Sequence, residues 1–95
     1  VLYTTDRKIV DIFHAISFLE PFQDIKQFQL VQDSYEKLTW ILNTDNGSYE
    51  GFITEETKKL FGERVDIEFK YVNEIPKLKS GKTRMTVCNI KDKIQ

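Results

Sequence analysis

The segment VDIEFKY, residues 65–71, has an apolar side chain at every odd position and a charged one at every even position. Successive side chains of a β-strand point to opposite faces of the sheet, so this alternation predicts a strand with one buried and one solvated face. The buried face needs other elements to cover it. The segment therefore predicts a layered fold in which helices pack on one side of a sheet.

Further strands are expected on both sides of the chain midpoint. Residues 25–32 and 38–43 alternate in the same way, and the turn-forming sequence DSYE separates them. This arrangement predicts an antiparallel hairpin. Short β-forming stretches flank the polar sequence TDRK near the start of the chain and predict a second hairpin, and one more short strand is expected near the end. The ranges of these shorter strands are residues 1–4, 9–12 and 84–88.

Two stretches have apolar residues at helical spacing. From Phe13 to Phe22 an apolar residue recurs every third position, which predicts a helix with one buried face that Pro21 brings to an end. Residues 49–61 predict a second helix, which Gly62 can stop. The order of elements predicts an α+β fold: a small antiparallel sheet with two helices on one face.

Composition narrows the class of protein. The chain has 95 residues, of which 40 % are hydrophobic and 31 % charged, with a formal net charge of -1. A chain of this length builds one core, so we expect a single domain over residues 1–95. Its near-neutral charge argues against a nucleic-acid partner, because nucleic-acid-binding domains carry an excess of Lys and Arg. The sequence has no stretch typical of a membrane span or a signal peptide.

Cysteine and histidine are too scarce for a metal or disulfide framework. One cysteine, Cys88, cannot form an internal disulfide, and a single histidine, His14, completes no zinc-binding set. We therefore expect no bound metal and a reducing, cytoplasmic compartment. Packing or local structural roles are favoured over catalysis for both residues, because no partner close in sequence would activate them.

The segment IPKLKSGKTR, residues 75–84, gathers basic residues around a glycine. Glycine lets a backbone approach a ligand closely, and Lys82 offers a compact positive charge suited to a phosphate or an oxyanion. A solvated surface loop is the alternative interpretation. The GKT sequence also ends a P-loop, but no glycine stands five residues before Gly81, and a strand is expected where a P-loop needs a helix. We reject a P-loop.

Two blocks together resemble a known domain. The loop from Pro76 to Gly81-Lys82, followed by Arg84, resembles the terminal motif of adenylate-forming enzymes. The sequence FQLVQ, residues 28–32, resembles the Phe/Tyr-Gln-x-x-Gln strand of their phenylacetate-CoA ligase branch, which includes coenzyme F390 synthetase and CapK-like proteins. The passage from Phe61-Gly62 into the strand that follows is also similar to that branch. The resemblance spans nearly the whole chain.

This resemblance implies a single C-terminal (lid) domain whose N-terminal adenylation domain lies outside the chain. Lys82 would be the catalytic lysine of an ATP-dependent acid ligase, with Gly81 and Arg84 beside the nucleotide. The full-length enzyme would use ATP and Mg²⁺, and coenzyme A where the acyl group passes to that thiol. No cofactor is expected to bind tightly to this chain alone. The expected partner is the adenylation domain of the same polypeptide, with neither nucleic acid nor membrane.

The competing hypothesis is a non-enzymatic, ferredoxin-like or ACT-like module that binds a small ligand or a protein. Trp40, Phe28 and Phe69 could form a stacking face for single-stranded RNA on such a sheet. Their alternation with polar residues favours core packing instead. The sequence upstream of this chain would decide between the ligase and the binding module.

Overall fold

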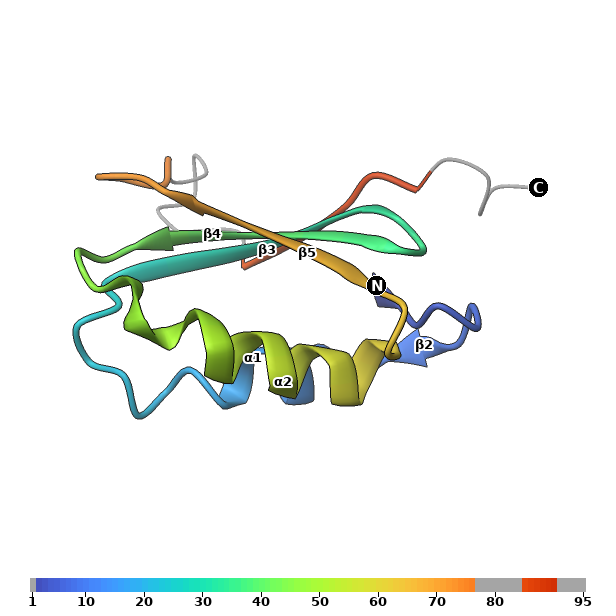
Figure 1. The fold of residues 1–95 in the computed structure, drawn as a ribbon. Coiled ribbons are helices and arrows are strands. Elements are labelled where there is room, and N and C mark those ends of the chain that lie inside the picture. Colours follow the sequence, from blue (N-terminus) through green and yellow to red (C-terminus); the bar gives the residue numbers. More distant parts are fainter. Residues whose placement is uncertain (1, 77–84, 91–95) are drawn as a thin grey trace.

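The computed structural model describes residues 2–76 and 85–90 and has two layers, a sheet and a pair of helices (Figure 1). The α+β class with two helices, predicted from the sequence, is confirmed. Within the described residues the elements are β1 (Leu2–Tyr3), β2 (Ile9–Val10), α1 (Ile12–Ser17), β3 (Gln27–Ser34), β4 (Lys37–Asn43), a 3-10 turn (Gly47–Tyr49), α2 (Glu50–Phe61), β5 (Asp66–Tyr71) and β6 (Thr86–Cys88).

The main sheet has the strand order β5-β4-β3-β6. The antiparallel hairpin predicted for β3 and β4 is confirmed, with Leu30 opposite Trp40. The prediction that the whole sheet is antiparallel is wrong, because β4 pairs with β5 and β3 pairs with β6 in parallel. Helix α2 is the reason for the first parallel pair: a helix between two strands carries the chain back to the starting end of the neighbouring strand.

This topology also differs from the ferredoxin-like alternative. A ferredoxin-like fold contains a split βαβ unit, in which another strand separates the two parallel strands that a helix joins. Here β4 and β5, joined by α2, are direct neighbours. The sheet is therefore built on a different plan.

The core lies between the helices and the face of the sheet that they cover (Figure 1). Residues one helical turn apart on α2, namely Ile53, Thr57 and Phe61, are buried against this face. Trp40 of β4 is fully buried, and its indole Nε1 donates a hydrogen bond to Thr57 Oγ1 at 3.1 Å. The core packing predicted for Trp40 is confirmed, and its ring is not available as a stacking surface.

Helix α1 is shorter than predicted, and one residue of its predicted buried face points outward. Asp11 caps its first turn by accepting a hydrogen bond from the Phe13 backbone N–H, and the helix ends at Ser17. Ala15 and Leu19 are buried, whereas Phe13 is 75 % exposed. The prediction that Phe13 belongs to the buried face is wrong. Residues two apart on a helix point in nearly opposite directions, so burying Ala15 exposes Phe13.

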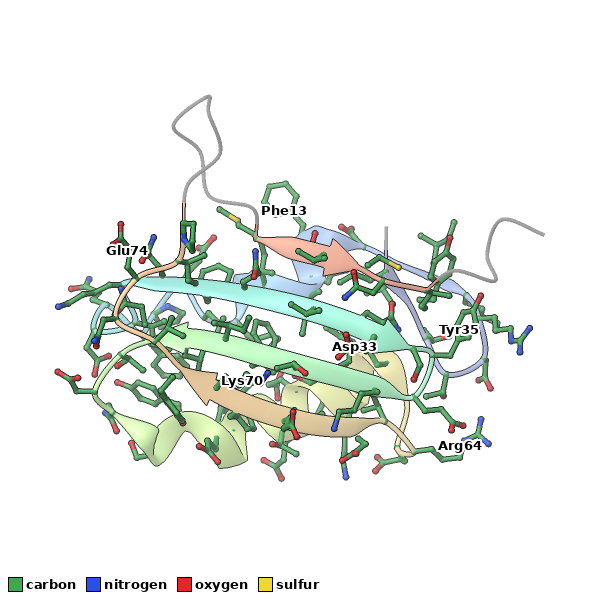
Figure 2. All side chains as sticks on the ribbon, turned by 90° about the horizontal axis from the view of Figure 1, so that it is seen from above. Phe13, Asp33, Tyr35, Arg64, Lys70 and Glu74 are labelled. Carbon is green, nitrogen blue, oxygen red and sulfur yellow. The ribbon has the colours of Figure 1, made fainter. Side chains whose placement is uncertain are left out.

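The second face of the sheet is open, as the VDIEFKY segment predicts (Figure 2). Lys70 of β5 and Asp33 of β3 lie on this face in the view from above. Val65 is buried, but Tyr71 remains 42 % exposed because β5 is an edge strand. The alternation therefore indicates the inner face correctly and overstates how deeply an edge strand is buried.

A buried side chain of the main sheet forms two hydrogen bonds with the N-terminal hairpin. Gln32 of β3 has no exposed surface, and its amide pairs with the Tyr3 backbone: Nε2 donates to the carbonyl at 2.7 Å, and Oε1 accepts from the N–H at 2.8 Å. This two-point contact imitates one step of a β-ladder. Gln32 therefore joins the small sheet of β1 and β2 to the large one.

Gly62 ends α2 as predicted, with φ of 120°, a conformation that side chains strongly disfavour. A Cβ at this position would lie 2.4 Å from Thr5 Oγ1 in the turn of the N-terminal hairpin. The Thr5 N–H donates to the Phe61 carbonyl at 2.8 Å in the same place. The glycine thus permits close contact between the helix end and the hairpin.

Candidate functional site

The basic loop begins from a fixed point. After β5 the Val72 N–H donates to the Leu42 carbonyl at 3.0 Å, and the chain then crosses the end of the sheet. The Gln27 side chain binds the Ile75 backbone twice, donating from Nε2 to its carbonyl at 3.1 Å and accepting from its N–H at 3.0 Å. Asn43 Nδ2 donates to the same Gln27 Oε1 at 3.0 Å. Ile75 itself is buried, so the start of the loop is held at the end of β3.

The far end of the loop is fixed on the same strand. The Met85 carbonyl accepts a hydrogen bond from the Leu30 N–H at 2.8 Å, and β6 then continues parallel to β3. Both ends of the connection are therefore attached to β3, between Gln27 and Leu30. A connection closed at its base in this way is a typical place for binding residues, because a rigid scaffold positions it.

The sequence-predicted site residues Gly81, Lys82 and Arg84 lie in 77–84, outside the described residues. The catalytic role of Lys82 and the nucleotide contacts of Gly81 and Arg84 stay predictions. Gln27 and Asn43, which anchor the loop, were not singled out from the sequence. The available signal was weak: both are amide residues on the open side of paired strands.

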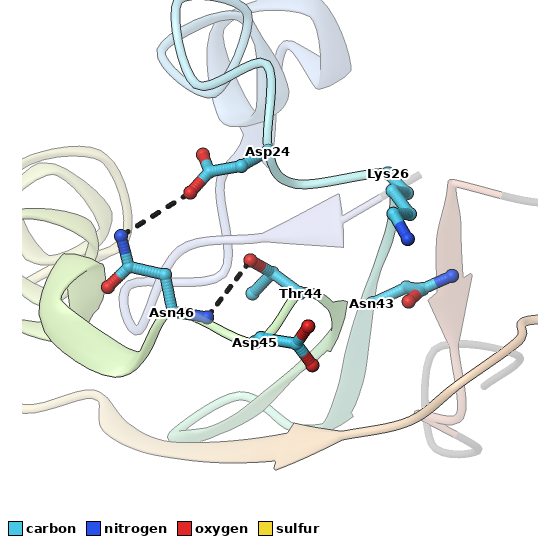
Figure 3. Close-up of a pocket in the computed structure, with 6 residues that line it drawn as sticks. All are labelled: Asp24, Lys26, Asn43, Thr44, Asp45 and Asn46. Carbon is cyan, nitrogen blue, oxygen red and sulfur yellow. Dashed lines mark hydrogen bonds between the residues drawn. The ribbon is translucent and has the colours of Figure 1, made fainter.

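A polar pocket of about 330 Å³ lies at the same end of the sheet (Figure 3). We call it the loop-end pocket. Asn43 both lines it and contacts Gln27, so the pocket and the anchor of the basic loop share a residue. Lys26 also lines a neighbouring hollow together with Gln27, Phe28 and Met85. The residues that line the loop-end pocket are Asp24, Lys26, Asn43, Thr44, Asp45 and Asn46.

Hydrogen bonds hold one wall of the loop-end pocket. The Tyr49 hydroxyl donates to Asp24 at 2.6 Å, and Asn46 Nδ2 donates to the other Asp24 oxygen at 3.4 Å. The bond from Tyr49 lowers the pKa of the Asp24 carboxyl, because it stabilises the charged form, and the same bond raises the pKa of Tyr49. This wall therefore keeps its negative charge opposite the ammonium of Lys26, which suits a polar ligand with both donors and acceptors.

The remaining chemical residues of the described segments do not form a second reactive centre. His14 is largely exposed and lies 3.7 Å from Asp11 across the first turn of α1, which fits a local role at the helix start. Cys88 is half-buried in β6 and packs against the core. No group of three His, Cys, Asp or Glu side chains within the described residues is placed to hold a metal ion. Among the helices described, none is long and apolar enough to cross a membrane.

Comparison with known proteins identifies the domain. The family model for the CapK C-terminal domain matches residues 2–89. The chain belongs to the CapK C-terminal domain family. Protein CapK of Staphylococcus aureus is 31 % identical over 86 residues, and the alignment covers 86 % of this chain. The chain spans only 19 % of the length of that relative. No solved structure matches the chain.

The family match covers the strand with Gln32, the anchors of the basic loop and the loop itself. The CapK-like part of the resemblance inferred from the sequence is thus confirmed. The wider placement among adenylate-forming enzymes and the phenylacetate-CoA ligase branch stays a prediction.

Proposed function

We propose that this CapK C-terminal domain belongs to an ATP-dependent acid ligase and supplies its catalytic lysine, Lys82. The observation that carries the proposal is the attachment of both ends of the Gly-Lys loop to one strand, through Gln27 and Leu30. Such an attachment gives the loop a firm base from which its lysine can act. The Gly81-Lys82 sequence and the membership in the CapK family support the same function.

The proposed chemistry needs a cation at this position. In acyl-adenylate formation a carboxylate oxygen attacks the α-phosphorus of ATP, the bond to pyrophosphate breaks, and an acyl-adenylate and pyrophosphate result. Both reactants are negative, and charge builds on the α-phosphate oxygens in the transition state. A lysine ammonium placed there stabilises that charge, which a neutral side chain cannot do. Gly81 and Arg84 would assist by close backbone approach and by a second cation.

The larger part of the protein would hold most of the substrates in this proposal. ATP with Mg²⁺, and the carboxylate, would bind to an N-terminal adenylation domain of the same polypeptide. Coenzyme A is the proposed acceptor where a thioester forms. This domain would then close over the adenylation domain, since domain motion is a common means of completing a catalytic site. We accordingly expect the isolated 95-residue chain to bind ATP poorly and to catalyse no adenylation.

The decisive experiment compares two lysines of the same loop in the full-length protein. Lys82→Ala and its matched control Lys79→Ala both remove one charge from residues 77–84. ATP–pyrophosphate exchange, measured with a panel of aryl and alkyl carboxylates, should fall on the order of 10²- to 10³-fold in Lys82→Ala and stay close to the parent rate in Lys79→Ala. Circular dichroism should show the same fold in both variants.

Two results would contradict the proposal in different ways. Equal exchange in Lys82→Ala and the parent protein would remove Lys82 from the mechanism. A full-length parent protein that neither binds ATP nor exchanges pyrophosphate with any carboxylate of the panel would exclude the ligase function itself.

A further inference from the structure

Two arginines flank a second pocket at the end of the sheet opposite the basic loop. In Figure 2 Tyr35 and Arg64 lie beside the turn from β3 to β4, whereas Glu74, which precedes the basic loop, lies at the other end. The pocket has a volume of about 430 Å³. We call it the arginine pocket. Its lining residues are Thr5, Arg7, Ser34, Tyr35, Glu36 and Arg64.

Three connections that belong to different parts of the chain form the frame of the arginine pocket. The turn of the N-terminal hairpin is tied to the end of α2, where the Thr5 N–H donates to the Phe61 carbonyl. The start of β5 is tied to the turn between β3 and β4, where the Asp66 N–H donates to the Glu36 carbonyl at 2.7 Å. Backbone hydrogen bonds thus fix the segments that carry the arginines, and a rigid frame is what a binding site requires.

Arg7 stands in a backbone conformation that arginine disfavours. Its φ is 67°, in the left-handed region that glycine adopts without steric cost. The surrounding turn enforces this conformation: Thr4 Oγ1 accepts from the Asp6 N–H at 3.2 Å and from the Lys8 N–H at 3.1 Å. Strain of this kind clusters at functional sites, where the surrounding structure holds the residue in the strained conformation.

The Arg7 side chain packs on the aromatic ring of Tyr35. Its guanidinium carbon lies 4.7 Å from the centre of the Tyr35 ring, in a cation–π contact. Tyr3 packs edge-on against Tyr35, with ring centres 5.7 Å apart. The guanidinium is therefore oriented before any ligand arrives, which lowers the entropic cost of binding.

Arg64 is the second cation and forms a weak ion pair with Glu36. Its Nη1 lies 3.9 Å from Glu36 Oε2, and both side chains are more than 60 % exposed. An exposed pair at this distance contributes little and can exchange its partner for a better one. Among the six lining residues Glu36 is the only carboxylate, against two guanidinium groups. The lining therefore has a net positive charge, with the hydroxyls of Thr5 and Ser34 as further donors.

We propose that the arginine pocket binds a phosphoryl group. A guanidinium group can donate two parallel N–H hydrogen bonds to the oxygens of a phosphate. Two guanidinium groups on separate connections, Arg7 and Arg64, can therefore bind one phosphoryl group together. The volume exceeds that of phosphate alone and leaves room for a small group attached to it. The proposal is independent of the ligase function, because the pocket lies at the opposite end of β3 from the basic loop.

Titration of the 95-residue chain with inorganic phosphate tests this site, because the described residues enclose their own hydrophobic core. Amide resonances are followed by NMR at constant ionic strength adjusted with sodium chloride. We expect saturable shifts at Thr5, Ser34 and Arg64, with a Kd on the order of 1 mM. A parallel titration with AMP distinguishes the sources of the phosphoryl group. Tighter binding of AMP indicates a nucleotide, and equal affinity indicates the phosphoryl group alone.

Four variants separate a built site from general charge attraction. Arg64→Ala and Arg7→Gly should each weaken phosphate binding about tenfold or more, and Glu36→Gln should strengthen it. Arg7→Gly also removes the backbone strain, so its melting temperature should not fall although phosphate binding is weakened. Lys70→Ala, which removes the same charge from the open face of the sheet, is the matched control and should leave the affinity unchanged.

Two results would overturn the phosphoryl site. The first is a phosphate titration without saturable shifts at the lining residues. The second is an equal loss of affinity in Lys70→Ala and in the two arginine variants, since this would show attraction to net charge alone.

Discussion

The contact between Gln32 and Tyr3 gives a sharp test of how the N-terminal hairpin is held. Gln32→Met keeps the length and approximate volume of the side chain and removes both polar groups. Each of the two hydrogen bonds contributes about 1 kcal/mol, and a buried backbone group left without a partner costs about 1–3 kcal/mol more. Tyr3 is half-buried, so water can satisfy part of what is lost. We expect the variant to lose about 2–4 kcal/mol of unfolding free energy.

A loss of about 2–4 kcal/mol is a large fraction of the total unfolding free energy of a small domain and can be measured. Domains of this length have an unfolding free energy of about 5–14 kcal/mol. Urea denaturation followed by the fluorescence of Trp40, the single tryptophan and fully buried, reports it directly. The exposed Gln23 provides the matched control: Gln23→Met should change the stability by less than about 0.5 kcal/mol. Hydrogen exchange of the Tyr3 amide should accelerate in Gln32→Met alone. If Gln32→Met loses no more than the control, the amide pair does not hold the hairpin.

Two further predictions concern the helix end and an edge tyrosine. Gly62→Ala should cost about 1–3 kcal/mol, because its φ of 120° and the 2.4 Å approach to Thr5 leave no room for a methyl group. Gly51→Ala, with nothing within 4 Å of the added Cβ, should instead gain about 0.5–1 kcal/mol, and similar melting temperatures for the two variants would be inconsistent with this reasoning. Burial and the hydrogen bond to Glu50 raise the pKa of Tyr71 to about 12, from the ordinary value of 10.0. The folded state therefore keeps a proton that the unfolded state loses, so the unfolding free energy should fall between pH 10 and 12, and fall less steeply in Tyr71→Phe. Equal slopes in urea titrations over that window would contradict the assigned shift.

Local patterns predicted the elements of this fold because they depend on neighbours along the chain. The alternation in β4 and β5 and the glycine after α2 each indicate a structure that a short segment determines by itself. The parallel pairings of β5 and β6 were missed because they depend on which strand becomes a neighbour after a long connection. The exposure of Phe13 was missed for a similar reason: Ala15, two residues further along the same helix, takes the buried position, and the spacing of the apolar residues alone does not show this.

The candidate sites also differ in whether local sequence or the overall fold brings their residues together. The Gly-Lys loop could be found from sequence because its residues are contiguous. The arginine pocket could not, because Arg7, Tyr35 and Arg64 come from connections that only the fold brings together. The backbone strain at Arg7 has no sequence signal at all, since a polar turn tolerates several residue types. Gln32 was noticed as part of a family pattern, and the structure gives its physical reason.

Gln32 also determines how mechanical load would pass through the domain. The side-chain amide of Gln32 forms two hydrogen bonds with the Tyr3 backbone, and the backbone carbonyl of Gln32 accepts from the Asn89 N–H at 2.8 Å. Strand β1 and the segment after β6 are therefore both bonded to one residue of an inner strand. A pull applied through β1 therefore enters the sheet near its middle. Both hydrogen bonds to Tyr3 are made by the same side-chain amide and carry the force in parallel. They should therefore break together and not one after another.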